Sequence, residues 1–492
     1  MSIPMYSILH ITDLHRAKND PISNSELLSA LISDRECYER EDPPIRPPDA
    51  IVVSGDVIQG VPLHYADFES ELAAQYGVAH DFLVSLADRF LNGDRTKVII
   101  VPGNHDIDWN VAFSSMVPVE DKDLPSNIPV ALFEPASPYR WDWKSRCLYK
   151  IQDETLYSQR LAAFWAFFER FYSGHGEMLR VAPWSDANLY SLDNGRIGIA
   201  AFNSCSGNDC FAFHGEISRE AVAQAHLDLK DLGPWRLRIA VWHHDIEGPP
   251  QRMDYMDIEV VRGMIGRGFR LGLYGHQHRV QITPQHARLL DEETMVVASA
   301  GSLCAGRREL PMGSLRGYSI VEIRDDYSGA RIHIREMRFA NLFSRAVLRD
   351  FEGRSYVDLE WTTPLDAAGR PENPVGEERI AILRKAEDAL HGRGDAAETL
   401  QLLSSIDIST DAFGRRLLLA AAAHSGPLKL IEMTGIPQTI EELVHLIDAY
   451  LAVGNAQAAA SVIADHAIRL SLPESIKADL QVNIELKKRT MS

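Results

Sequence analysis

Short apolar runs alternate with amphipathic patterns over the first three hundred residues of the chain. Residues 6–11, 49–54 and 96–101 are apolar, β-branched runs of strand length, and a helical pattern covers roughly 67–92. Further strands are predicted over residues 196–203, 236–242, 269–274, 294–299, 317–323 and 330–337. Alternation of this kind predicts an α/β layout with a mostly buried sheet.

Two helix starts are marked by their capping residues. Residues 23–26 read SNSE, which has the spacing of a capping box, and Leu27 and Leu31 follow on one face of the predicted helix. Ser218 is expected to cap a second helix in the same way.

Residues 107–185 interrupt the alternation. The stretch is rich in Pro and Trp and contains one helical pattern crowded with aromatic residues, LAAFWAFFERFY. We interpret it as a cap-like insertion that borders the functional site. Its aromatic side chains are expected to belong to a core rather than to a platform for substrate.

The pattern changes again after residue 340. A loop-rich stretch ending in GRPENPVGEE is typical of a linker, and the remainder is wholly helical and rich in Ala and Leu. Within it, residues 389–403 and 449–463 resemble each other and the helical hairpins of tetratricopeptide-like arrays. We expect a first domain over 1–340, a linker over 341–375 and a helical domain over 376–492. The helical domain is expected to bind a second copy of the chain or another protein.

Composition narrows the class of protein. A chain of 492 residues exceeds one ordinary core, and 45% apolar with 24% charged residues is typical of soluble globular proteins. No apolar run reaches the roughly 18 residues of a membrane span, and the N-terminus lacks the features of a secretory signal. Five scattered cysteines predict free thiols in a reducing compartment. We therefore expect a cytoplasmic protein that does not engage a membrane.

The charge is unevenly distributed. A formal net charge of −19 argues against a protein that holds nucleic acid by overall electrostatics. The stretch from Arg262 to Arg354, however, is rich in arginine and contains no lysine. It represents either a set of solvated strand edges or a basic wall that faces a phosphate-rich substrate.

Five predicted strands end in residues that can bind metal ions. The strand ends are followed by TDLH, GDVIQG, PGNHD, HHD and GHQH. Ligand sites of α/β sheets lie beyond the carboxyl ends of the strands, so we expect these side chains to meet at one edge. The candidate metal ligands are Asp13, His15, Asp56, Asn104, His243, His276 and His278.

The residue types indicate which ions are bound. Imidazole and carboxylate donors without thiolate suit Mn, Fe or Zn. Seven donors exceed the needs of one ion and suit two, so one carboxylate must bridge them, and a water held between two dications loses its proton near neutral pH. Glycines at 55, 103 and 275 are expected to permit tight turns close to an anion.

The five motifs in this order resemble the calcineurin-like metallophosphoesterase superfamily over about residues 6–340. The resemblance implies a two-layer β-sandwich flanked by helices, with a dinuclear centre, most simply of manganese, at one edge. It also implies how the ligands divide between the two ions: Asp13, His15 and His278 hold one, Asn104, His243 and His276 hold the other, and Asp56 bridges them.

The resemblance also implies roles for residues that are not ligands. His105 is expected to contact the phosphoryl oxygen or to protonate the leaving group. His244 is expected on the substrate side or behind the ligands, and Asp106 completes the predicted catalytic set.

Departures from related branches bear on the substrate. Protein serine/threonine phosphatases of the superfamily carry an acidic residue and an arginine where this chain has Gln59 and Gly60, and they end in a single ligand histidine. The combination of GNHD and GHxH is more similar to the phosphodiesterase and nuclease branch. We therefore predict a dimetal enzyme that hydrolyses phosphodiesters of nucleotides or nucleic acid through a metal-bridging hydroxide. The alternatives are a phosphomonoesterase of the same fold and a scaffold protein that acts through its helical tail.

Overall fold

The protein is described here by a computed structural model in which the chain forms two compact units, Met1–Leu365 and Asp366–Ser492. The structure describes residues 4–17, 22–133, 137–176, 178–246, 254–286, 294–306, 309–311, 314–339, 341–346, 353–361, 382–383, 385–387, 389–390, 393–406, 408, 412–470, 472, 477, 480–482 and 484–485.

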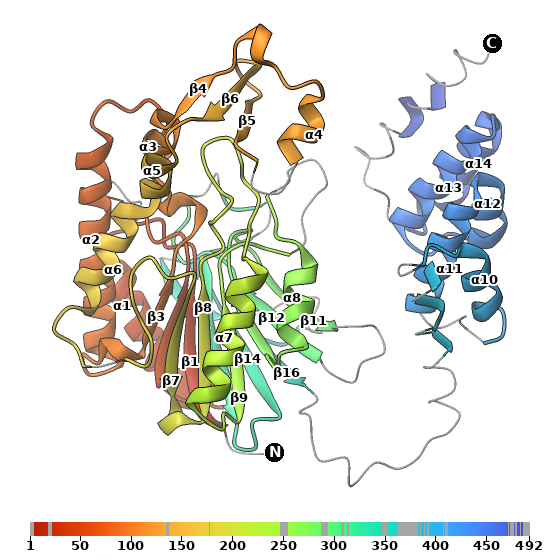
Figure 1. Ribbon diagram of the computed structural model, residues 1–492. Helices are drawn as coiled ribbons and strands as arrows, with labels where there is room; N and C mark the ends of the chain where they lie inside the picture. The colour runs from red at the N-terminus through yellow and green to blue at the C-terminus, as the bar shows by residue number, and fades with distance from the viewer. Residues whose placement is uncertain are drawn as a thin grey trace. The chain divides into compact units, whose positions relative to one another are not determined.

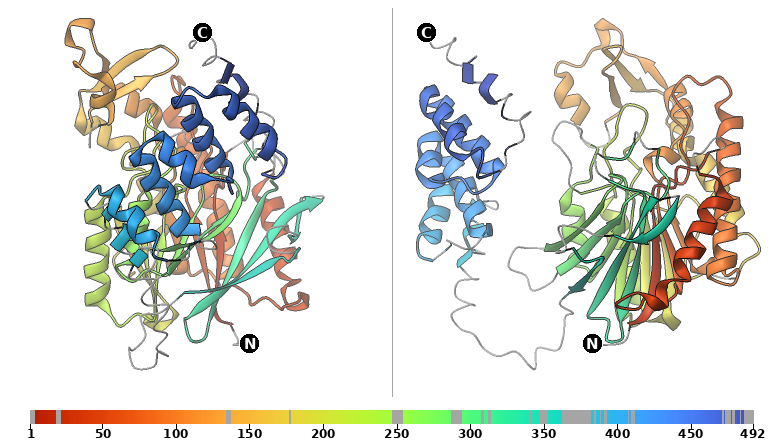
Figure 2. Two further views of the ribbon diagram at one scale, coloured as in Figure 1. Left: turned by 90° about the vertical axis from the view of Figure 1, so that its right-hand side faces the viewer. Right: turned by 180° about the vertical axis from the view of Figure 1, so that it is seen from behind.

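The first unit contains a large mixed sheet with the strand order β15-β14-β13-β1-β2-β3, in which β16 also pairs with β14 (Figure 1). Strands β1, β2 and β3 are parallel, whereas β13 lies antiparallel beside β1 although the two are about three hundred residues apart. Figure 2 shows from behind how the N-terminal and the later strands form one continuous sheet. The strands span Pro4–Ile11 (β1), Ala50–Ser54 (β2), Val98–Val101 (β3), Gly317–Arg324 (β13), Gly329–Phe339 (β14), Leu342–Arg345 (β15) and Tyr356–Glu360 (β16).

A second sheet with the order β11-β12-β10-β9-β8-β7 packs against the first. Val52 and Ile320 of the first sheet share one hydrophobic core with Ile239 and Leu273 of the second. The predicted α/β layout is confirmed. The strands of the second sheet span Ala187–Leu192 (β7), Ile197–Phe202 (β8), Leu237–Val241 (β9), Leu271–Tyr274 (β10), Val280–His286 (β11) and Thr294–Ala300 (β12).

Helices cover the outer faces of both sheets, which explains why the central strands are apolar throughout. Helices α1 (Asn24–Arg35) and α2 (Phe68–Phe90) cover the first sheet, and α7 (Arg219–Leu232) and α8 (Ile258–Ile265) cover the second. The capping box predicted for α1 is present, because the Glu26 amide donates to Ser23 Oγ and the Ser23 amide donates to the Glu26 carboxylate. Ser218 caps α7 by accepting from the Ala221 amide.

The insertion predicted over 107–185 is smaller than expected. Helix α6 (Ala162–Tyr172) packs against α2, where Phe167 stacks on Tyr76 with ring centroids 5.2 Å apart, and its aromatic side chains are buried in the main core. These aromatics are core residues, as predicted, but they belong to the sandwich and not to a cap. The amphipathic pattern alone did not show which neighbour the apolar face would cover.

The remaining insertion is a small sheet of order β4-β6-β5 that rises above the edge of the sandwich where β1 ends (Figure 1). Its strands span Met116–Pro118 (β4), Tyr139–Asp142 (β5) and Cys147–Ile151 (β6), and the short helices around them are α3 (Trp109–Ser114), α4 (Ile128–Phe133) and α5 (Glu154–Ser158). Buried Asp209 joins it to the sandwich by accepting from Arg140 Nε at 2.5 Å and from the Tyr157 hydroxyl at 2.7 Å.

The predicted linker over 341–375 is wrong in its first half. Strands β15 and β16 pair antiparallel with β14, so the sheet continues to Glu360. In the sequence, these two short strands and the Gly and polar residues between them have the composition of a loop. Only their pairing with β14 in the structure shows that they are strands. Residues 362–375, and the GRPENPVGEE segment with them, lie outside the described residues.

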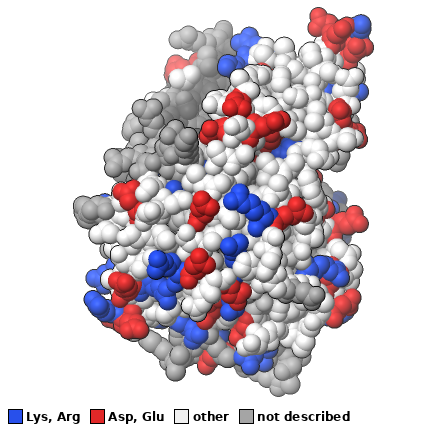
Figure 3. Space-filling model, turned by 90° about the vertical axis from the view of Figure 1, so that its left-hand side faces the viewer, with Lys and Arg blue, Asp and Glu red and all other residues white. Residues whose placement is uncertain are grey.

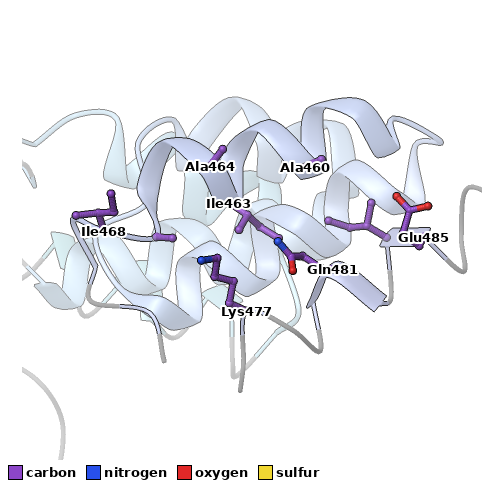
Figure 4. Close-up of a pocket in the computed structure, with 9 residues that line it drawn as sticks. Ala460, Ile463, Ala464, Ile468, Lys477, Gln481 and Glu485 are labelled. Atoms are coloured by element: carbon purple, nitrogen blue, oxygen red, sulfur yellow. The ribbon is translucent and has the colours of Figure 1, made fainter. Parts of the chain in front are cut away.

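The second unit is helical where the structure describes it. Its helices are α10 (Ala396–Leu403), α11 (Ala412–Ser425), α12 (Pro427–Thr434), α13 (Ile440–Ala452) and α14 (Ala456–His466). The two segments that resemble each other in sequence share a local structure: Gly394 and Gly454 both have positive φ, and Asp395 and Asn455 then cap the next helix. A pocket of about 620 Å³ with a mostly apolar lining lies between α14 and the residues Lys477, Gln481, Ile484 and Glu485 (Figure 4).

Within the part of the chain that the structure describes, no helix is both long enough and apolar enough to cross a bilayer. All five cysteines are described, and all are free thiols, as predicted; Cys205, Cys210 and Cys304 are buried.

The arginine-rich stretch forms ion pairs within its own unit. On the face shown in Figure 3, basic and acidic side chains are interspersed. Four arginines of the stretch are neutralised by acidic partners, which argues against a basic wall at these positions: Arg324, Arg331 and Arg338 are partly exposed, whereas Arg335 is buried against Asp34. The pairs are Arg324–Glu360, Arg331–Asp358, Arg335–Asp34 and Arg338–Glu336.

Candidate metal centre

The predicted ligand residues lie at the carboxyl ends of β1, β2, β3, β9 and β10, on loops with unusual backbone conformations. Five of these non-glycine residues have positive φ, a region that costs about 1–3 kcal/mol and persists where surrounding structure enforces it. Backbone strain is therefore present at five of the seven predicted ligands, although other described residues, such as Asn92 and Tyr327, also have positive φ. The five ligands and their φ values are Asp13 (51°), His15 (43°), Asp56 (50°), His276 (76°) and His278 (54°).

One group of donors forms a first site. Single ligand atoms of Asp13, His15, Asp56 and His278 all lie within 4.8 Å of one another. His15 Nε2 and His278 Nε2 are 3.0 Å apart, and His278 Nε2 is 3.2 Å from Asp13 Oδ1. Two imidazole nitrogens and two carboxylates that converge in a buried space match the donor set of a divalent transition metal.

A second group converges next to it and shares Asp56. Asn104 Oδ1 is 3.0 Å from His243 Nε2 and 2.9 Å from His276 Nδ1, and His243 Nε2 is 3.3 Å from Asp56 Oδ1. Asp56 Oδ2 lies on the side of His15, 3.8 Å from its Nε2. The two oxygens of one carboxylate therefore face the two groups. The donors fit two divalent ions with Asp56 between them.

Burial and mutual charge shift the pKa values of these groups strongly. Burial opposes the charged form, but the Asp13 carboxylate raises the pKa of His278 to about 9, and His278 in turn lowers the pKa of Asp13 to about 2. Asp56 likewise raises the pKa of His243 to about 9 against the effect of burial. Without metal, the centre thus consists of two buried histidine–carboxylate pairs.

The sequence profile of calcineurin-like phosphoesterases matches residues 6–280, which include every one of the five motifs. The chain belongs to this family. Among curated proteins, no relative matches the sequence significantly.

The solved structures that resemble this calcineurin-like phosphoesterase are remote from it in sequence. The structure of PhoD is 11% identical, with a TM-score of 0.41 and coverage of 77% of this chain and 76% of PhoD. A putative 5'-nucleotidase from Staphylococcus aureus is 11% identical, with a TM-score of 0.31 and coverage of 78% and 59%. The calcineurin-like phosphoesterase YfkN from Bacillus subtilis is 13% identical, with a TM-score of 0.27 and coverage of 79% and 98%.

Metal binding to this phosphoesterase is expected to release protons. Metal ligands must be deprotonated, and His243 and His278, with pKa values of about 9, are mostly protonated at pH 7.5 in the metal-free protein. Binding should therefore release about two protons at this pH, and affinity should rise as pH increases toward 9. Calorimetric titration with Mn²⁺ in two buffers of different protonation enthalpy measures the number. A His278→Asn variant should release one proton fewer, and a wild-type value of zero would contradict the pairing.

His105 lies beside the first site without joining either group of donors. Its ring meets the ring of His15 edge-on with centroids 4.6 Å apart. Its backbone amide donates to Asp56 Oδ1 at 2.9 Å, and its Nδ1 lies 2.6 Å from the Gln59 carbonyl oxygen. Because a carbonyl only accepts, Nδ1 carries a proton, and Nε2 is the nitrogen left to exchange one.

Asp106 was expected in the catalytic set, but its carboxylate is committed to the backbone. Oδ2 accepts from the amides of Val57 and Gly103, at 3.1 and 2.8 Å, and Oδ1 accepts from the Tyr76 hydroxyl at 3.1 Å. Burial, with the nearby Asp56 charge, raises its pKa to about 7. Asp106 therefore joins the GD and GNHD loops, and a catalytic role for it is not supported by this geometry.

His244 was also expected among the catalytic residues, yet both its ring nitrogens are occupied. Nδ1 lies 2.9 Å from Ser204 Oγ, and Asn208 Nδ2 donates to Nε2 at 3.1 Å. The ring is fully buried, and burial together with neighbouring His276 lowers its pKa well below the ordinary value. His244 is a neutral residue behind the donors. Of the two positions expected for His244, on the substrate side or behind the ligands, this geometry favours the second.

The three glycines of the motifs are required for different reasons. Gly55 has a φ of 95°, so it makes the turn that was predicted. A Cβ on Gly103 would lie 2.2 Å from Asp56 Oδ1, and a Cβ on Gly275 would lie 1.9 Å from Thr12 Oγ1. Gly103 and Gly275 are therefore needed to leave space for the Asp56 carboxylate and for Thr12 beside Asp13.

Several residues that position the donors were not found from the sequence. The carbonyl oxygens of Ser54 and Glu309 lie 2.9 and 3.0 Å from Nδ1 of His243 and His278, and the Thr12 hydroxyl donates to Asp13 Oδ2 at 2.7 Å. A backbone carbonyl leaves no sequence signal. Thr12 is the exception, because it acts through its side chain and stands next to the predicted ligand Asp13 in the sequence.

Proposed function

We propose that this protein is a dimetal phosphodiesterase. The observation that carries the proposal is the convergence of two groups of donor atoms on the two oxygens of Asp56. Two divalent ions, when bound there, lower the pKa of a coordinated water and stabilise charge on phosphoryl oxygens. Manganese is the ion we expect first for these nitrogen and oxygen donors, and Fe or Zn would also fit.

The step that the ions do not supply is protonation of the leaving group. Hydrolysis adds the oxygen of water to phosphorus and breaks one P–O ester bond, and the leaving oxygen takes a proton. We assign this proton to His105 Nε2, because the Gln59 carbonyl accepts the hydrogen bond of the other ring nitrogen. Its backbone bond to Asp56 fixes the distance between this proton donor and the metal ligands.

A diester is favoured over a monoester by charge. A phosphodiester carries one negative charge at neutral pH, whereas a monoester approaches two and needs more positive charge around it. The GD loop of this chain has the neutral residues Gln59 and Gly60, and the Gln59 side chain donates to the Glu309 carboxylate at 2.9 Å. The net charge of −19 further favours small diesters, such as those of nucleotides, over long nucleic acid.

The test compares two chromogenic substrates under the same conditions. With Mn²⁺, kcat/KM for bis-p-nitrophenyl phosphate should exceed that for p-nitrophenyl phosphate. The reverse order would identify a monoesterase, and the absence of both activities from a protein holding two ions per chain would favour a scaffold. A panel of cyclic nucleotides, single-stranded DNA and RNA then identifies the natural class of diester.

We infer that the helical unit mediates association with a second copy of the chain. In support, Leu428 and Ile468 on its surface are 71% and 92% exposed, which is unusual for large apolar side chains. A chain ending at residue 365 should stay folded and bind metal, because the donors and their core lie in the first unit. It should also form a smaller assembly than the full chain by sedimentation equilibrium. A monomeric full-length chain would contradict self-association and leave a different protein as the partner.

A further inference from the structure

Ligand histidines must present a lone pair to a metal, and the proton on the other ring nitrogen then needs an acceptor. In His243 and His278 this requirement is met by backbone carbonyls: Nδ1 faces the carbonyl oxygens of Ser54 and Glu309, so Nε2 faces the centre. His15 also faces the centre with Nε2, and its buried Nδ1 has no hydrogen-bond partner among the described residues.

His276 is oriented the other way round. Its Nδ1 is the nitrogen that faces the second group of donors, 2.9 Å from Asn104 Oδ1. Its Nε2 is buried and has no hydrogen-bond partner in the described part of the chain. The charged atom that lies nearest to Nε2 in an ion-pair contact is Asp254 Oδ2, at 3.8 Å.

Proton counting makes this contact significant. A neutral imidazole carries one N–H, and a metal bound at Nδ1 requires that the proton sits on Nε2. A buried N–H without an acceptor is destabilising, so the tautomer that binds metal needs a partner at Nε2. Asp254 is the carboxylate near enough to become that partner; 3.8 Å is longer than a hydrogen bond, so the two side chains must move closer together when the metal binds.

Hydrogen bonds of the residues that follow Asp254 in the sequence hold this segment in place. The Met256 amide donates to the Asp245 carbonyl at 2.7 Å, and Asp257 caps α8 by accepting from the Glu259 amide. The Asp254 side chain is 19% exposed, and its Oδ1 is buried without a hydrogen-bond partner among the described residues. Asp254 is thus a partly buried carboxylate, and a donor such as His276 Nε2–H would stabilise its charge through Oδ2, the oxygen that faces the ring.

We propose that Asp254 is a positioning residue for the second metal site. It accepts the Nε2 proton of His276 and thereby directs the Nδ1 lone pair toward the ion. The inference rests on the dinuclear centre of the proposed function, and it adds a residue outside the five motifs. A partner of this kind typically changes metal affinity about 10–100-fold.

The test measures Mn²⁺ binding to the full-length protein by equilibrium dialysis, without substrate. The wild-type chain should bind two ions. Asp254→Ala should keep one ion at wild-type affinity and bind the second about 10–100-fold more weakly. Asp254→Asn, whose amide oxygen still accepts a hydrogen bond, should lose less. Hydrolysis by Asp254→Ala should recover as the Mn²⁺ concentration is raised.

Asp257→Ala is the matched control, because it removes a carboxylate from the same segment and loosens the start of α8 without facing the centre. It should bind both ions as the wild type does. If Asp254→Ala and wild type give the same isotherm, or if Asp257→Ala weakens the second ion equally, the inference is wrong. If Asp254→Ala does not fold, Asp254→Leu, which has a similar size and no acceptor, replaces it, and a wild-type isotherm for Asp254→Leu would overturn the inference. A wild-type chain that binds one ion would instead refute the dinuclear centre itself.

Discussion

The Asp56→Asn protein is expected to lose both catalysis and metal, with kcat reduced at least roughly 10³-fold, as when a major electrostatic stabiliser is removed. Asp56 is buried, and its two oxygens face the two groups of donors, 3.3 Å from His243 Nε2 and 3.8 Å from His15 Nε2. Asparagine has the same shape but no charge and only one oxygen, so it cannot serve both ions.

Metal content and turnover should be measured on the same preparation. We expect fewer than two ions per chain for Asp56→Asn after dialysis against Mn²⁺, and no recovery of turnover when Mn²⁺ is added back. Asp81→Asn is the control, because Asp81 is a mostly exposed aspartate on α2. An Asp56→Asn protein with two ions and undiminished turnover would refute the assignment of Asp56 as the bridge.

The His105→Ala protein should show a different combination: normal metal content with kcat lowered about 10²–10⁴-fold, the usual contribution of a positioned proton donor. His105 touches the donors through its backbone amide, which alanine retains, while its imidazole contacts the Gln59 carbonyl and the edge of His15. The loss should be smallest for diesters with acidic leaving groups, which need little protonation.

A series of aryl phosphodiesters with leaving groups of increasing pKa makes this test quantitative. For His105→Ala, log kcat should fall more steeply with leaving-group pKa than for the wild type. His80→Ala, which removes an imidazole from α2, should behave as the wild type does. Equal slopes would refute proton donation, and a loss of metal would show that His105 supports the ions.

The sequence determined the strands that end in the five motifs, the loops that follow these strands and the candidate donors on those loops. This was possible because the information is local: an apolar run of strand length, a glycine and a polar residue at its carboxyl end lie within about ten residues of each other. The capping residues Ser23 and Ser218 were readable for the same reason. Five such strand ends in one chain also sufficed to indicate the family.

Tertiary structure decided what each side chain of those motifs does. Asp106 turns away to bind the amides of Val57 and Gly103, and His244 turns toward Ser204 and Asn208, although both stand next to predicted ligands in the sequence. Neighbouring positions on a loop point in different directions according to backbone φ and ψ, and a motif does not encode those angles. Contacts between distant segments of the chain determine in which direction each of these side chains points.

The acceptors behind the donors were likewise beyond the sequence. Every residue has a backbone carbonyl, so the sequence does not indicate that the carbonyl of Glu309 will accept the hydrogen bond of His278 Nδ1. Asp254 is one of many aspartates in the chain, and only folding brings it within 3.8 Å of His276. The same reason explains β15 and β16, because a short strand is stabilised by its partner β14 and carries little signal by itself.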